Sequence, residues 1–189
     1  NPGFGLSQSD ALKLYGLFTG FVYFTPLIGG WLADNYLGQR KSVIIGGLVM
    51  AAGQFTLAAA IPGNLQLFYI GLVLLVLGNG FFKPNISTMV GSLYEKGDSK
   101  RDAGFNIFYM GINIGAFIAN FLAAIMRNAL FWEAVFFAAG CGMLISCAIL
   151  LSSWKVLEKA DVVPGDKPGD TPFSEIMGKI LGPALVLGV

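Results

Sequence analysis

Long apolar runs separated by short polar stretches dominate the pattern of hydrophobic and polar positions along the chain. Each run is long enough to cross a hydrocarbon core of ~30 Å, which takes about 20 helical residues. The runs are too long and too evenly apolar for the alternating strands of a barrel, so we expect membrane-spanning helices. The five predicted spans cover residues 11–34, 42–61, 66–93, 103–126 and 131–153.

Polar and charged residues mark where the first helix should begin and how the chain divides. Ser7, Ser9 and Asp10 are good N-cap candidates for the first span, because their side chains can accept hydrogen bonds from a first helical turn. After the fifth span the sequence becomes charged and rich in Pro and Gly, which is typical of a linker. We therefore predict a partial transmembrane bundle, a linker and the start of a further helix, over residues 1–154, 155–171 and 172–189.

The composition agrees with a membrane protein and excludes several other classes. Of 189 residues, 55% are hydrophobic and 12% are charged, and the mean hydropathy is +0.69. A soluble domain carries about 25% charged residues. The net charge of +1 gives no electrostatic basis for binding nucleic acid. The chain has no histidine, which removes Ser-His and Cys-His catalysis and most zinc sites, so we expect neither an enzyme nor a cofactor or metal. Cys141 and Cys147 lie within an apolar run and are predicted to be small core side chains.

Basic residues in the loops predict the orientation in the membrane. Eight of them fall in alternate loops, whereas only Lys13 and Arg127 fall on the opposite side. The eight are Arg40, Lys41, Lys96, Lys100, Arg101, Lys155, Lys159 and Lys167. The positive-inside rule then places the N-terminus outside the cell and the linker in the cytoplasm. An outside N-terminus without a signal sequence is most simply explained by a preceding helix, so we expect a fragment of a larger transporter-like protein.

Lys83 is the charged residue that stands out within the predicted spans. It lies in the third span, twelve residues before Glu95, which at 1.5 Å per residue places it about 18 Å from that end and near the midplane. A charge there costs at least ~2.5–3.5 kcal/mol and requires a water-filled cavity or an anionic partner. Asn79 and Ser87 are spaced to share its helix face. We predict a residue on a substrate or proton path; the alternative is a structural lysine bound to backbone carbonyls.

Amide and aromatic side chains form a second candidate surface on the fourth span. Asn106, Asn113 and Asn120 repeat every seven residues and so share a face. These amides must be hydrogen-bonded, either to neighbouring helices or in a polar cavity. Tyr109 lies one turn from Asn113, and this pair could bind a small polar ligand. In the first span, Tyr23 is a further candidate for lining a cavity.

Small residues and one acidic residue give further predictions about helix packing and gating. The pairs Gly16/Gly20 and Gly111/Gly115 have the small-xxx-small spacing that lets helices approach closely. Asp34 lies at the end of the first span, where the helix dipole disfavours an anion. It needs compensation from Arg40 or from the N-terminus of another helix. We predict a conformational latch at this hairpin; the alternative is an ordinary surface ion pair.

Three stretches of the sequence together resemble a known transporter family. The pattern Gly30-x-x-x-Asp34-x-x-x-Gly38 with Arg40 is similar to the motif between the second and third helices of the major facilitator superfamily. The fuller Gly29-Gly30-Trp31-Leu32-Ala33-Asp34 form resembles the proton-dependent oligopeptide transporter (POT/PTR) family. So do the runs Gly-Asn-Gly-Phe-Phe-Lys-Pro-Asn at 78–85 and Phe-Tyr-Met-Gly-Ile-Asn-Ile-Gly at 108–115. The resemblance extends over about residues 6–154.

The resemblance implies an architecture and an activity. The architecture is an all-α bundle of two six-helix halves, in which the five spans are the second to sixth helices of the N-terminal bundle. The activity is proton-coupled symport of di- and tripeptides by alternating access, in a bacterial inner membrane. The alternative is a transporter of the same fold for another small anion such as nitrate. Residues 172–189 then match either an inter-domain helical hairpin or the start of the seventh helix.

The resemblance also implies roles for individual residues. Lys83 is similar to the family's intramembrane lysine, which couples protons to substrate. Asn113 falls on an asparagine that contacts the peptide's backbone or terminus, and Tyr23 falls on a ligand-facing tyrosine. Tyr109 and Ile112 fall on positions of the side-chain pocket. We therefore expect these five residues to contact the substrate, and Asp34 with Arg40 to form the latch.

Overall fold

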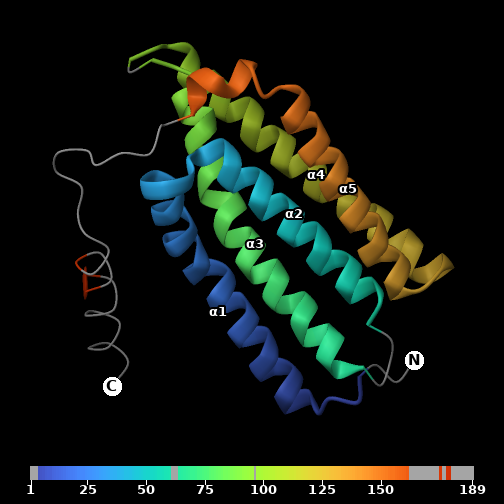
Figure 1. The fold of residues 1–189 in the computed structure, drawn as a ribbon. Coiled ribbons are helices and arrows are strands. Elements are labelled where there is room, and N and C mark those ends of the chain that lie inside the picture. Colours follow the sequence, from blue (N-terminus) through green and yellow to red (C-terminus); the bar gives the residue numbers. More distant parts are fainter. Residues whose placement is uncertain (1–3, 61–63, 96, 162–174, 176–177, 180–189) are drawn as a thin grey trace.

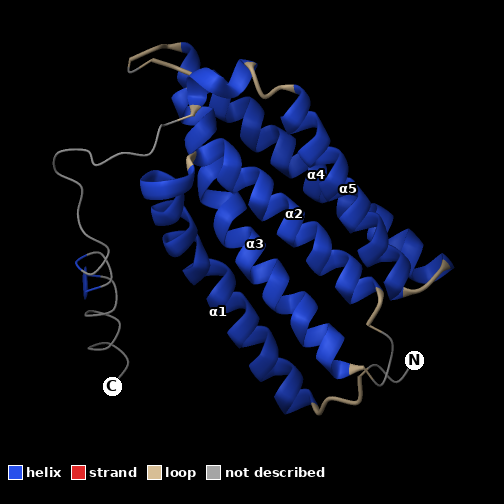
Figure 2. Cartoon of the chain, in the orientation of Figure 1, coloured by secondary structure: helices blue, strands red, loops and turns tan. Residues whose placement is uncertain are grey.

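The computed structural model describes residues 4–60, 64–95, 97–161, 175 and 178–179, which form helices joined by short connections (Figure 1, Figure 2). The five long helices are α1 (Gln8–Leu32), α2 (Gln39–Ala58), α3 (Leu65–Ser92), α4 (Lys100–Ala129) and α5 (Trp132–Ser152). A π-helical turn, η1 (Ala33–Leu37), extends α1, and a 3-10 helix, η2 (Val156–Ala160), follows α5. All five long helices are long and apolar enough to cross a membrane, which confirms the five predicted spans to within a turn at each end.

Side-chain caps explain where two of the helices begin. Ser7 Oγ accepts a hydrogen bond from the backbone N–H of Asp10 at 3.1 Å, so the predicted cap of α1 is confirmed. Asn64 Oδ1 accepts one from the N–H of Leu67 at 3.2 Å and caps α3 in the same way. Each cap satisfies an N–H group that has no partner within its own helix.

The helices are arranged around a central pair. α2 and α3 make the most extensive contact, α1 packs on the other side of α3, and α5 packs on α2 (Figure 1). α4 lies beside α5 and contains no buried residue. We call the end of the bundle at which α1 passes into α2 the Gly38 end; η2 also lies there (Figure 1). The bundle therefore has a tight core of α1, α2, α3 and α5, and a loosely attached α4.

Glycines bring the backbones of the central helices close together. A Cβ on Gly46 would lie 2.6 Å from the carbonyl oxygen of Gly78, and one on Gly53 would lie 3.1 Å from that of Gly71. Between α1 and α3, a Cβ on Gly29 would overlap the carbonyl of Gly80. These contacts are with backbone atoms, which cannot rotate away, so no larger side chain fits without moving a helix.

The predicted packing role of the small-xxx-small pairs is wrong for the described residues. A Cβ on Gly16, Gly20, Gly111 or Gly115 would meet no described atom within 4 Å. The spacing places two small residues on one face, but it does not say which face meets a neighbour. Among the described contacts, the faces that meet are those of Gly29, Gly46, Gly53, Gly71, Gly78 and Gly80.

The cysteines agree with the prediction of small core side chains. Both are free, Cys147 is buried and Cys141 is half-buried. Cys147 lies against Gly47 of α2, where a Cβ would come within 2.5 Å of the sulfur. The α2–α5 contact thus depends on a glycine facing a small thiol.

The part of the predicted linker that the structure describes is packed on the bundle. After α5 the chain folds back over the Gly38 end, and Ala160 in η2 is fully buried. Residues 162–171 lie outside the described residues. Of the predicted further helix over 172–189, only Glu175, Gly178 and Lys179 are described; they are helical, and Glu175 pairs with Lys179 at 2.8 Å. The division at 154 and the role of 172–189 stay predictions.

Candidate functional site

A proline in α1 creates the first polar contact between α1 and α3. Pro26 has no N–H, so the carbonyl of Val22, four residues earlier, loses its partner within the helix. Asn79 Nδ2 of α3 donates a hydrogen bond to this carbonyl at 2.9 Å. The contact satisfies a backbone acceptor that the proline leaves free, and it sets the register of α3 along α1.

Two further polar contacts pin the same pair of helices. Thr25 Oγ1 donates to the carbonyl of Val76 at 3.0 Å, and also to its own helix at Phe21. Asn85, which is buried, donates to the carbonyl of Gly29 at 3.4 Å. The sequence singled out Asn79 only as a polar neighbour of Lys83. Its role as a donor to the Val22 carbonyl could have been anticipated from Pro26, because a proline within a helix leaves the carbonyl four residues earlier without a partner.

This register places Tyr23 beside Lys83. Tyr23 follows Val22 in α1, and Lys83 lies one turn after Asn79 in α3. The Lys83 ammonium lies 5.2 Å from the centroid of the Tyr23 ring, within the range of a cation–π interaction. Both side chains are exposed, Tyr23 at 69%. The structure thus brings two of the predicted site residues together.

The Lys83 ammonium keeps its hydrogen-bonding capacity. Among the described residues it makes no ion pair, and it donates no hydrogen bond to a backbone carbonyl. Lys83 lies in the second half of α3, nine residues before the helix ends at Ser92. Its three N–H donors can therefore bind an anionic group without breaking an existing bond.

The α4 candidates form a second group. Asn113 Nδ2 donates to the carbonyl of Tyr109 at 2.8 Å, which leaves the amide oxygen unused among the described residues. Tyr109 and Ile112 are 53% and 51% exposed. Asn120 lines a cavity of about 780 Å³ between α4 and α5, and Phe82 of α3 reaches the same cavity. In the described structure these amides do not bridge to a neighbouring helix.

The two groups remain separate in the described residues. No hydrogen bond, ion pair or ring contact joins Lys83 and Tyr23 to Asn113, Tyr109 and Ile112. The described residues also contain no cluster of three or more His, Cys, Asp or Glu that could hold a metal. The arrangement offers a cation with an aromatic ring on one side, and an amide with an aromatic and an aliphatic side chain on the other.

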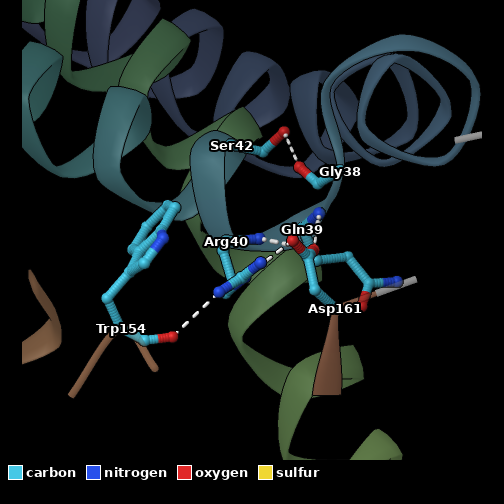
Figure 3. A network of polar contacts seen from close by, with 6 residues as sticks. All are labelled: Gly38, Gln39, Arg40, Ser42, Trp154 and Asp161. Carbon is cyan, nitrogen blue, oxygen red and sulfur yellow. Dashed lines mark hydrogen bonds and ion pairs between the residues drawn. The ribbon is translucent and has the colours of Figure 1, made fainter. Parts of the chain in front are cut away.

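The Gly38 end carries a network that the sequence did not predict. Arg40 Nε pairs with Asp161 Oδ2 at 2.7 Å, and Arg40 Nη1 donates to the carbonyl of Trp154 at 2.8 Å (Figure 3). Asp161 Oδ1 also accepts the backbone N–H groups of Gln39 and Arg40 (Figure 3). Sequence reasoning missed Asp161 because it lies more than a hundred residues from Arg40 in what was predicted to be a linker.

The expected pairing of Asp34 with Arg40 is therefore corrected. Arg40 is taken by Asp161, and Asp34 is exposed in η1. The one hydrogen bond that the Asp34 carboxylate accepts from a described residue comes from Gln39 Nε2, at 3.5 Å. The physical reason is that Asp161 reaches the N-terminus of α2 and the guanidinium at once, which Asp34 does not. Asp34 thus keeps an accessible negative charge at the Gly38 end.

Comparisons with known proteins identify related sequences. A model of the POT family matches residues 40–179. A peptide transporter of Yersinia enterocolitica is 47% identical over 148 residues, which is 78% of this chain and 29% of that protein. A di-/tripeptide transporter of Lactococcus lactis is 38% identical over 146 residues, or 77% of this chain and 29% of that protein.

Solved structures give the same result for the fold. A mutant of a peptide transporter POT in complex with alafosfalin superposes with a TM-score of 0.80 at 35% identity, covering 98% of this chain and 38% of that one. A POT family transporter in complex with a thioalcohol-conjugated peptide gives a TM-score of 0.79 at 28% identity, with the same coverage. The fold is thus that of part of a major facilitator superfamily transporter, as the sequence predicted. The chain spans about 30–40% of the length of the proteins that it matches.

Proposed function

The chain belongs to the POT family of transporters, and from this premise we propose that the protein carries di- and tripeptides across a membrane together with protons, by alternating access. The matched relatives named above are described as peptide and di-/tripeptide transporters. The same family membership argues against an enzyme.

The single observation that carries the proposal is the Lys83–Tyr23 pair. An ammonium on a long apolar helix, 5.2 Å from an aromatic ring and with unused N–H donors, can bind a carboxylate. Every peptide has a carboxylate end, and a proton-binding carboxylate of the protein offers the same chemistry. Protonation of such a carboxylate would release Lys83, and this would link proton binding to substrate binding.

The α4 residues extend the proposed site to the rest of the peptide. The free Asn113 amide oxygen can accept a hydrogen bond from the peptide's ammonium or backbone N–H. Tyr109 and Ile112 supply apolar surface for side chains. Because the charged ends and the backbone are common to all peptides, a site of this kind predicts broad selectivity.

The proposal includes an orientation of the helices in the membrane. The Gly38 end faces the cytoplasm of a bacterial cell and the start of α1 faces outside, as the basic loops indicate. Asp34 supplies the exposed charge of the cytoplasmic latch. Arg40 contributes by holding the start of α2, through Asp161 rather than through Asp34.

The test combines two transport assays in proteoliposomes with the protein at its natural length. Lys83→Ala should abolish dialanine accumulation driven by a pH gradient, because the coupling ammonium is gone. Exchange of labelled for unlabelled dialanine, which needs no net proton movement, should survive. Both rates are normalised to folded protein, and Lys13→Ala, an exposed lysine near the start of α1, is the matched control.

Three results would count against this function. Driven uptake at the parental level in Lys83→Ala would remove Lys83 as the coupling residue. Equal loss of both assays together with lower folded yield would indicate a structural lysine. Uptake of nitrate but not of dialanine by the parent protein would replace the peptide with a small anion.

A further inference from the structure

The carboxylate of Asp161 occupies the N-terminus of α2, although the two are far apart in the sequence. Its Oδ1 accepts the backbone N–H of Gln39 at 3.0 Å and that of Arg40 at 3.2 Å (Figure 3). The residue at the N-cap position of α2 is Gly38, which has no side chain to accept these bonds. Asp161 therefore does the work of an N-cap from outside the helix, where the helix dipole also favours a negative charge.

Gly38 makes room for this carboxylate in two ways. Its φ of 78° lies in the left-handed region that favours glycine. A Cβ at this position would lie 3.2 Å from Asp161 Oδ1, closer than an ordinary contact. The glycine thus supplies both the turn that starts α2 and the space above its first N–H groups.

Arg40 contacts both ends of the segment that runs from Trp154 to Asp161. It pairs with Asp161 at 2.7 Å, and it donates to the carbonyl of Trp154 at 2.8 Å while its guanidinium lies 4.6 Å from the Trp154 ring centroid. The two side chains of the ion pair are only 13% and 16% exposed. Ala160, next to Asp161, is fully buried. A shielded, charge-assisted pair of this kind is stronger than an exposed surface pair.

We propose that residues 153–161 form a strap and that the Asp161 carboxylate is what holds it closed on α2. With the strap closed, the end of α5 and the start of α2 are tied together and move as one body. This inference depends on the contacts of Asp161 and Arg40 and not on which substrate the protein carries.

The test measures whether the strap opens when the carboxylate is removed. Ala160→Cys places a thiol at the buried position in η2, and its modification by N-ethylmaleimide is followed by mass spectrometry of the purified protein in detergent. We expect slow modification with Asp at 161 and at least about tenfold faster modification after Asp161→Ala, which removes the cap and the ion pair together. Asp161→Asn keeps an oxygen for the two backbone N–H groups but loses the charge, so its rate should lie between the two.

Two thiols serve as controls in the same experiment. Val156→Cys lies in η2 at a position that is 73% exposed, and it should react at the same rate with Asp or Ala at 161. The native Cys147 is buried between α2 and α5 and reports general unfolding. Equal rates for Ala160→Cys in both backgrounds, or a rise matched by Cys147, would overturn the proposal.

A second measurement needs no introduced cysteine. Hydrogen exchange of the backbone amides of Gln39 and Arg40 reports the bonds to Asp161 directly, because Asp161 is the acceptor for both. Asp161→Ala should increase exchange at these two amides by about tenfold and leave the α3 amides near Asn79 unchanged. Unchanged exchange at Gln39 and Arg40 would show that the carboxylate does not hold the strap. Neither measurement involves transport, so its failure is distinct from failure of the proposed function.

Discussion

At the scale of the single residue, Lys83 shows how much of the cost of a charge within a membrane span a local contact can offset. Placing a lysine at the centre of a membrane helix costs about 2.5–3.5 kcal/mol on insertion scales. The cation–π contact with Tyr23 recovers about 0.5–2 kcal/mol, depending on how dry the site is. The remainder has to come from water or from an anion. A lysine whose cost of insertion is only partly offset by the protein is suited to binding and releasing a charged ligand.

Asn113 gives a prediction at the same scale. If its free amide oxygen binds a peptide terminus, Asn113→Ala should weaken competition by several different dipeptides to the same extent. Loss of one charge-assisted hydrogen bond costs about 1.5–3 kcal/mol, which is roughly tenfold to a hundredfold in affinity. Asn128→Ala, an exposed asparagine at the end of α4, is the matched control. Competition curves that coincide with those of the parent protein would remove Asn113 from the site.

Arg40 shows where prediction from the sequence reaches its limit at this scale. Lys83 and the hairpin charges could be found because a charge in or beside an apolar run is visible locally. The partner of Arg40 could not be found in this way. Local spacing pointed to Asp34, whereas the structure selects Asp161, which is brought near only when the chain folds back after α5. Tyr23 was identified as a candidate, but its contact with Lys83 depends on the register that Asn79 sets between α1 and α3.

At the scale of the element, the contact between α2 and α3 depends on paired glycines. Gly46 faces Gly78 and Gly53 faces Gly71. Gly46 and Gly53 are seven residues apart in α2, and Gly71 and Gly78 are seven residues apart in α3, so in two antiparallel helices each glycine meets its counterpart on one face. This spacing is visible in the sequence, whereas the predicted small-xxx-small pairs Gly16/Gly20 and Gly111/Gly115 meet no described atom within 4 Å of an added Cβ. The number and type of helices could be predicted from hydropathy, but the faces that meet required knowledge of both helices at once.

A stability measurement tests this contact. Gly46→Ala puts a methyl group within 2.6 Å of the Gly78 carbonyl oxygen, and the backbone there cannot move aside without separating the helices. We expect a loss of about 1–3 kcal/mol, the usual cost of overpacking, seen as a lower unfolding temperature in detergent. Gly16→Ala meets no described atom within 4 Å and should be neutral or slightly stabilising, because alanine is the better helix former. Equal melting of the two variants would contradict the close approach.

At the scale of the whole molecule, the described helices differ in how closely they pack. α1, α2, α3 and α5 are joined by glycine contacts, by polar contacts around Pro26 and by Asp161 at the Gly38 end. α4, which carries Asn113, has no buried residue and makes only sparse contacts with α5 and α3. In the proposed transporter, Lys83 therefore lies on the closely packed helices and Asn113 on the sparsely packed α4. A ligand that contacts both would add a link between α3 and the sparsely packed α4.

Asp34 gives the prediction that belongs to this scale, because a latch acts on the balance between whole conformations. Its carboxylate is exposed at the Gly38 end and Arg40 is held elsewhere, so its charge is available to another part of the protein. Asp34→Asn should shift that balance and change the transport rate by about fivefold or more, the size of a typical coupling between sites. The equilibrium affinity for dialanine, measured by competition, should stay within about twofold, because a latch does not touch the ligand. Glu158→Gln removes an exposed charge from η2 at the same end and should change neither quantity. If Asp34→Asn transports at the parental rate, Asp34 is an ordinary surface charge and the gate depends on contacts elsewhere.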